Sequence, residues 1–126
     1  MLRIDLENTA VQLLNDYMGA WNRKDLPGLE KTFHFPHFRF ARNRLQTLES
    51  AGIQNPKLVW GRVGSDWGHS EWTHLHVVHA SAEKIHVDAE FARYQKDGSL
   101  KATYQSLYIL TCEKGAWGIK MRSSFA

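Results

Sequence analysis

Four segments near the C-terminus limit what the chain can fold into. Residues 72–81, 85–94, 102–112 and 117–125 are rich in aromatic and β-branched residues, which favour strands. The connections between them are short and polar, and Gly98 and Gly115 lie within two of them, as is usual in hairpin turns. The pattern predicts an antiparallel meander of four strands.

The N-terminal segment has a different period. At about 100° per residue, positions 8–23 separate into an apolar arc and a polar arc, which is typical of an amphipathic helix. We expect Asp5 to cap this helix and the basic residues Arg23 and Lys24 to end it. The apolar arc consists of Ala10, Leu13, Leu14, Tyr17, Met18 and Trp21.

A second, short helix is predicted directly after the first. Asp25 is its candidate cap, and Pro27 lies in its first turn, where the missing N–H is not needed. The side chains that this helix is expected to bury are Leu26, Leu29 and Phe33.

Residues 34–68 carry weaker signals. Alternation over 34–44 predicts a short strand after Pro36. Thr47 is expected to cap a brief helical segment that stops at Gly52, and a glycine-rich loop is expected after Asn55 and Pro56.

Helices followed by a long sheet indicate an α+β fold in which the helices cover one face of the sheet. The 126 residues have the length of one domain, so we expect a single domain over 1–126. With 43% hydrophobic and 23% charged residues, the composition excludes the disordered and collagen-like classes.

The third segment of the meander is apolar on both faces. By alternation Tyr104, Tyr108 and Leu110 share one face, whereas Leu107 and Ile109 lie on the other. Two short helices shield only one face of a sheet. We therefore expect the other face to pack against a second copy of the chain in a homodimer.

Charge and hydropathy exclude several partners. The net charge is +3 and the basic residues are scattered, so we expect no nucleic-acid partner. No apolar segment has the length that a bilayer requires, and the N-terminus lacks a signal peptide's apolar block, so we expect a cytoplasmic protein with no membrane partner. Cys112 has no second cysteine to pair with, and nothing in its flanks predicts a reactive thiolate.

Residues 11–33, with the step Asn22-x-x-Asp25-Leu26-x-x-Leu29 between the helices, resemble the opening of the nuclear transport factor 2-like superfamily. This superfamily includes ketosteroid isomerases and SnoaL-like polyketide cyclases, and the predicted meander extends the resemblance over almost the whole chain. The resemblance implies a cone-shaped, curved antiparallel sheet wrapped around the N-terminal helices, with an apolar pocket inside and a dimer on the outer sheet face. Functions in the superfamily are diverse, so the fold does not supply the chemistry.

The resemblance to ketosteroid isomerases implies roles for individual residues. Tyr17 matches the tyrosine that donates a hydrogen bond to the substrate oxygen. Tyr108 lies near the place of the neutral carboxylic acid that completes their oxyanion hole. Ala41 occupies the place of their aspartate base, so that base is absent. Met121 and Phe125 match apolar residues that line their pocket.

Plainer interpretations exist for the same residues. Tyr17 and Tyr108 are either two donors that converge on one ligand oxygen or core tyrosines at a helix–sheet interface. Trp21, one turn beyond Tyr17, is pocket wall or core. Arg122 is expected to face away from the pocket, because Met121 beside it is expected to face inward.

Two hypotheses involve histidines. His37 is a candidate acid–base group at the pocket mouth, and a turn histidine is the alternative. His74 and His76 share one strand face at a spacing that can hold a metal, but a metal needs a third ligand on that face. We predict solvated or dimer-facing histidines there, with no metal site and no cofactor.

Three functions remain open from the sequence. The first is a small-molecule-binding protein whose ligand is apolar or of mixed polarity. The second is an acid–base enzyme of the isomerase, cyclase or dehydratase type with His37 and Tyr17 as catalytic residues. The third is a non-catalytic dimerisation module. The residues expected around the ligand are Tyr17, Trp21, Ala41, Tyr108, Met121 and Phe125.

Overall fold

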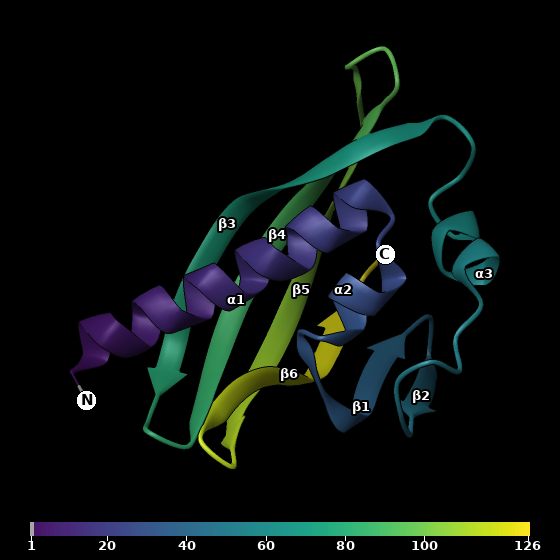
Figure 1. Cartoon of the computed structure of the whole chain (residues 1–126). Helices are drawn as coiled ribbons and strands as arrows, with labels where there is room; N and C mark the ends of the chain where they lie inside the picture. Colours follow the sequence, from purple (N-terminus) through teal and green to yellow (C-terminus); the bar gives the residue numbers. More distant parts are fainter. Residues whose placement is uncertain (1) are drawn as a thin grey trace.

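The computed structural model describes residues 2–126 and consists of three helices and one curved sheet (Figure 1). The sheet order is β2-β1-β6-β5-β4-β3. This arrangement confirms the predicted α+β class. The helices are α1 (Arg3–Arg23), α2 (Leu26–Glu30) and α3 (Pro56–Gly61), and the strands are β1 (Phe33–Ala41), β2 (Arg44–Leu48), β3 (Trp67–Ala80), β4 (Lys84–Gln95), β5 (Leu100–Glu113) and β6 (Ala116–Ser124).

The last four strands form the antiparallel meander that their sequences predict. The sheet is not antiparallel throughout, however, because β1 pairs with β6 in parallel. This one parallel pair brings the strand that follows the helices next to the last strand of the chain. Residues from β1 and β6 therefore meet on the inner face of the sheet.

Helix α1 lies across the inner face of the sheet and packs against β3, β4 and β6 (Figure 1). Four residues of its apolar arc are buried, with Ala10 and Leu14 fully enclosed, and Leu13 and Trp21 are partly buried. The helix begins earlier than predicted: Leu2 holds the N-cap position without a side-chain cap. Asp5 as the cap is therefore wrong. It lies instead in the first turn, where a carboxylate favours the positive end of the helix dipole.

The short helix α2 forms where the sequence predicts it, with Asp25 as its cap. The Asp25 side chain accepts a hydrogen bond of 3.0 Å from the backbone N–H of Gly28. Leu26, Leu29 and Phe33 are buried as predicted.

The helical segment expected from Thr47 is wrong, because Thr47 lies in β2 and pairs with Phe38 of β1. Arg42 and Asn43 between these strands have φ angles of 53° and 63°. Two successive positive φ angles are typical of a tight hairpin turn, which directs the chain back along β1. Strand β1 also begins before Pro36 rather than after it, with an irregular pairing where the proline lacks a backbone donor.

The glycine-rich segment contains a helix that the sequence analysis missed. Asn55 caps α3 by accepting a hydrogen bond from the N–H of Lys57. The indole N–H of Trp60 then donates to the backbone oxygen of Trp21 at 2.9 Å. This bond holds α3 against the C-terminal end of α1.

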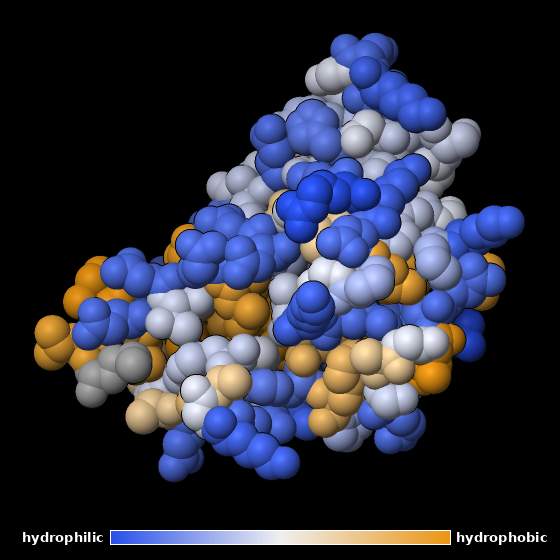
Figure 2. Space-filling model, viewed as in Figure 1, coloured by the Kyte–Doolittle hydropathy of each residue, from blue (hydrophilic) through white to orange (hydrophobic). Residues whose placement is uncertain are grey.

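The face that carries α1 is largely hydrophilic, and apolar side chains gather near the N-terminal end of the helix (Figure 2). Leu2 and Ile4 are exposed there. Within residues 2–126, no helix has both the length and the apolar character needed to cross a membrane.

Candidate functional site

A cavity lies between the C-terminal half of α1 and the inner face of the sheet. It leaves about 50 Å³ for the centres of water-sized molecules. One enclosed water needs roughly 10–15 Å³ by this measure, so the cavity has room for a ligand larger than water. The aromatic and apolar residues that line it are Tyr17, Met18, Trp21, Val63, Phe91, Tyr108 and Ala126; the charged ones are Arg39, Arg62, Arg93 and Arg122, and Ser70 and Ser124 complete the lining.

Tyr17 and Arg122 are joined at the centre of this lining. Arg122 donates a hydrogen bond of 2.6 Å from Nη1 to the phenolic oxygen of Tyr17. Both side chains are buried. Burial opposes ionisation of Tyr17, but the charge of Arg122 favours it, and the pKa of Tyr17 lies below its usual value.

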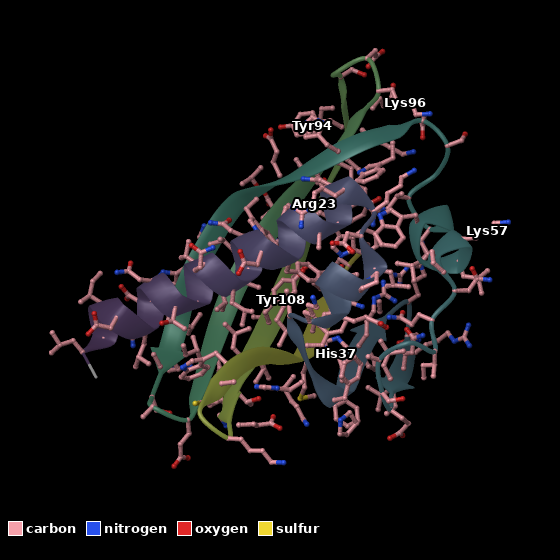
Figure 3. All side chains as sticks on the ribbon, in the orientation of Figure 1. Arg23, His37, Lys57, Tyr94, Lys96 and Tyr108 are labelled. Carbon is pink, nitrogen blue, oxygen red and sulfur yellow. The ribbon has the colours of Figure 1, made fainter. Side chains whose placement is uncertain are left out.

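Tyr108 lies beside Tyr17 as predicted, with ring centroids 5.7 Å apart in an edge-to-face arrangement. Burial and then the neighbouring Tyr17 raise the pKa of Tyr108 well above its usual value. Tyr108 therefore stays protonated and keeps a hydroxyl that can donate a hydrogen bond. Figure 3 shows it on β5, with His37 on β1.

His37 does not reach the cavity as the sequence predicted. Its Nδ1 lies 2.9 Å from the backbone oxygen of Ile119, and its Nε2 accepts a hydrogen bond of 3.1 Å from Nε of Arg122. The acceptor role of Nε2 requires the neutral tautomer with the proton on Nδ1. Burial and then the charge of Arg122 lower the pKa of His37 to about 3.

Both ring nitrogens of His37 are therefore occupied, and the ring also stacks on Phe33 with centroids 3.8 Å apart. His37 orients Arg122 rather than exchanging protons with a bound molecule. The expectation of an acid–base histidine at the pocket mouth is not met by this geometry.

Arg122 faces the cavity, so its predicted outward orientation is wrong. Leu110 pairs with Ile119 and both are buried, whereas Ile109 pairs with Met121, which is 40% exposed. Lys120 is thus an extra residue, and such a bulge inverts the alternation of side chains beyond it. The bulge turns Arg122 inward and Met121 outward.

Met121 and Phe125 are consequently absent from the cavity lining, and Phe125 is 79% exposed. Ala41 is buried at the end of β1 but does not line the cavity either. Trp21 does line it and packs edge-to-face on Trp60 with ring centroids 5.1 Å apart. Of the residues expected around the ligand, the structure brings together Tyr17, Trp21 and Tyr108.

Three further arginines surround the same space. Arg39 is the register partner of Arg122 on the adjacent strand, so the two side chains point to the same face. Arg62 follows α3, donates from Nε to the oxygen of Val59 at 3.1 Å, and lies over the ring of Trp21. Arg93, on β4, lies 4.8 Å from the ring centroid of Tyr104.

These charges repel one another. Burial and then the charges of Arg122 and Arg39 lower the pKa of Arg62 to about 9. Burial and then Arg122 also lower the pKa of Arg39. Across residues 2–126, none of the four arginines forms a salt bridge, and no Asp or Glu side chain of the described chain lines the cavity.

The sequence analysis missed Arg39, Arg62 and Arg93 because they lie on three separate segments. One signal was available: Arg39 stands between Phe38 and Phe40 on a strand, where an isolated charge among aromatic residues suggests a special environment.

His74 and His76 lie close to each other on β3. His74 lies 3.3 Å from Asp88, and its ring centroid is 6.2 Å from that of His76. No group of three or more His, Cys, Asp or Glu side chains in the described chain is arranged to hold a metal ion.

Comparison with known proteins identifies the fold. No family model matches the chain, and no curated protein matches its sequence significantly. Solved structures match it closely in shape. An NTF2-like protein of unknown function from Pseudomonas putida KT2440 has a TM-score of 0.76 at 16% identity, over 100% of this chain and 89% of that one. The chain has the NTF2-like fold.

Two further structures agree. A ketosteroid isomerase-like protein from Erwinia carotovora atroseptica has a TM-score of 0.67 at 20% identity, over 98% of this chain and 97% of that one. A protein of unknown function with a cystatin-like fold from Nostoc punctiforme has a TM-score of 0.77 at 6% identity, over 99% and 92% of the two chains. At such identities an NTF2-like fold does not assign an activity.

Proposed function

We propose that the protein binds a small molecule in the cavity between α1 and the sheet. The observation that carries this proposal is the convergence of Tyr17, Tyr108 and Arg122 on a space walled by Trp21 and Phe91. Ligand sites typically combine an apolar, aromatic wall with a few polar groups that fix orientation. The lining is of mixed polarity rather than apolar, as its arginines show.

Binding is favoured over acid–base catalysis by the state of His37. His37 was the candidate base. Both of its ring nitrogens already have hydrogen-bond partners, and it does not line the cavity. Tyr17 remains as a hydrogen-bonding group for an oxygen-bearing ligand.

Screening ring-bearing fragments by amide chemical-shift changes in ¹H–¹⁵N spectra tests the proposal. Fragments that bind should shift residues around the cavity. Ser124→Phe would fill the space from β6, since Ser124 lines it, and should weaken binding about tenfold or more. Ser123→Phe is the matched control, because Ser123 pairs with the exposed residues Phe40 and Leu107 on the outer face. Unchanged binding in Ser124→Phe, or shifts confined to the outer face, would contradict the proposal.

We also propose that the protein forms a homodimer through the outer sheet face. Leu107, Ser123, Phe40 and Leu45 form one row across β5, β6, β1 and β2. The side chains of Leu107, Phe40 and Leu45 are 52%, 49% and 63% exposed, respectively. Met121 belongs to the adjacent row. A contiguous apolar patch of this kind favours association with a second copy.

A further inference from the structure

We infer that the cavity binds a small organic carboxylate, held by Arg39, Arg62 and Arg122 together with Tyr17, with the apolar body of the ligand against Trp21 and Phe91. This inference rests on the proposed small-molecule binding, since it names the ligand class of the same cavity.

The arginines come from separate elements but line the same cavity. Arg39 and Arg122 are register partners on adjacent strands, whose backbones lie about 4.8 Å apart in any sheet. Arg62 approaches from α3, which the bond between Trp60 and Trp21 holds in place. Two guanidinium groups from the sheet and one from the helix side thus surround a single space.

The hydrogen-bond partners of these arginines are not carboxylates. Arg122 donates to Tyr17 and to His37, and Arg62 donates to a backbone oxygen. Within residues 2–126 the structure pairs none of them with a carboxylate. Partly buried like charges without a counter-charge destabilise a protein, and an anion in their midst removes that penalty.

The other residues of the lining indicate which class of anion the cavity binds. A guanidinium group matches the two oxygens of a carboxylate through parallel N–H bonds, and Tyr108 keeps a protonated hydroxyl beside it. Trp21 and Phe91 offer ring faces and edges to an apolar body.

Isothermal titration calorimetry with benzoate and phenylacetate, against the isosteric neutral amides benzamide and phenylacetamide, tests the inference. The acids should bind about tenfold or more tightly than the amides. Arg39→Gln and Arg62→Gln should each weaken binding of the acids about tenfold, whereas Arg44→Gln, which removes one exposed charge from β2, should leave it unchanged. Inorganic phosphate should bind more weakly than benzoate.

Thermal unfolding of the same variants distinguishes a loss of ligand binding from a loss of folding. Without ligand, Arg62→Gln should melt at or above the wild-type temperature, because it relieves repulsion from Arg39 and Arg122. At the same concentration, phenylacetate should raise the melting temperature of the wild type more than that of the variant, because the variant binds it about tenfold more weakly.

Three outcomes would overturn the inference. If the amides bind as tightly as the acids and Ser124→Phe blocks both, the cavity is a ligand site but does not select carboxylates. If phosphate binds as tightly as benzoate, charge alone determines the affinity, and the aromatic ring of the ligand contributes nothing to it. If acids and amides both fail to bind, the carboxylate assignment is wrong, and an empty fragment screen would extend that failure to the proposed function.

Discussion

Arg122 at the end of β6 donates a 2.6 Å hydrogen bond to the phenolic oxygen of Tyr17 in α1. The bond joins the helix to the sheet across the cavity. It also gives the buried charge of Arg122 one of its two side-chain partners, the other being His37. The bond therefore contributes both to stability and to the geometry of the ligand site.

Tyr17→Phe should destabilise the protein by about 1.5–3 kcal/mol, because it removes the acceptor of a buried charged hydrogen bond and leaves the ring in place. Urea unfolding at neutral pH measures the change. Tyr94→Phe is the matched control, since Tyr94 lies outside the cavity and stacks on His69. Equal stability of Tyr17→Phe and the wild type would mean that the bond contributes nothing.

The neutral His37 should make stability depend on pH. Its pKa is about 3 in the folded chain against 6.5 without the fold. Between these values the unfolded chain binds a proton that the folded chain does not, so stability is fully present above pH 6.5 and falls as the pH drops. The free energy of unfolding should decrease by about 1.4 kcal/mol per pH unit below 6.5.

Unfolding curves from pH 7.5 to 5 check this slope above the range in which carboxylates titrate. His37→Gln should lose the slope, whereas His76→Gln, which changes an exposed histidine on the outer face, should keep it. A wild-type stability that stays flat over this range would show that His37 protonates without cost.

The proposed homodimer can be tested by sedimentation equilibrium. Wild type should sediment at twice its chain mass of 14.5 kDa at micromolar concentration. Met121→Glu places a charge within the outer apolar rows and should shift the equilibrium toward monomer. Thr103→Glu adds the same charge to an exposed position of β5 outside those rows and should leave it unchanged. A monomeric wild type would contradict the proposed interface.

Efficient ketosteroid isomerisation is expected to be absent. Ala41 has no group that accepts a proton, and His37 is engaged through both nitrogens. A positioned base contributes about a hundred- to ten-thousand-fold to such reactions. A β,γ-unsaturated ketosteroid should therefore show at most residual turnover from binding and hydrogen bonding. The absorbance of the conjugated product measures it. Turnover that His37→Gln abolishes would overturn this expectation.

The main elements of the fold were predictable because their signals are local. The apolar arc of α1 and the alternation in β4 each extend over many residues, and Asp25 marks the start of α2 directly. The resemblance placed Tyr17 and Tyr108 around one cavity, and helical spacing from Tyr17 placed Trp21 there. These three positions were predictable because all of them lie on long, regular elements.

The features that were not predicted depend on single residues or on contacts between distant segments. The resemblance placed Met121 inside, and alternation from Met121 then placed Arg122 outside. The extra residue at Lys120 inverts the faces of the residues beyond it, so both placements are wrong. The turn at Arg42 and Asn43 uses positive φ angles that side chains other than glycine adopt rarely. The arginine cluster is a tertiary feature, since the parallel pairing of β1 with β6 is what brings Arg39 beside Arg122.

The most direct test of an anion site in the cavity is the ¹H–¹⁵N spectrum of the arginine Nε–H groups during titration with phenylacetate. A bound carboxylate should shift the resonances of Arg39, Arg62 and Arg122, because each side chain lines the cavity. The resonances of Arg3, which pairs with Glu7, and of the exposed Arg44 serve as internal controls. We predict saturable shifts for Arg39, Arg62 and Arg122 and none for Arg3 and Arg44. Shifts confined to Arg3 and Arg44, or none at all, would contradict an anion site in the cavity.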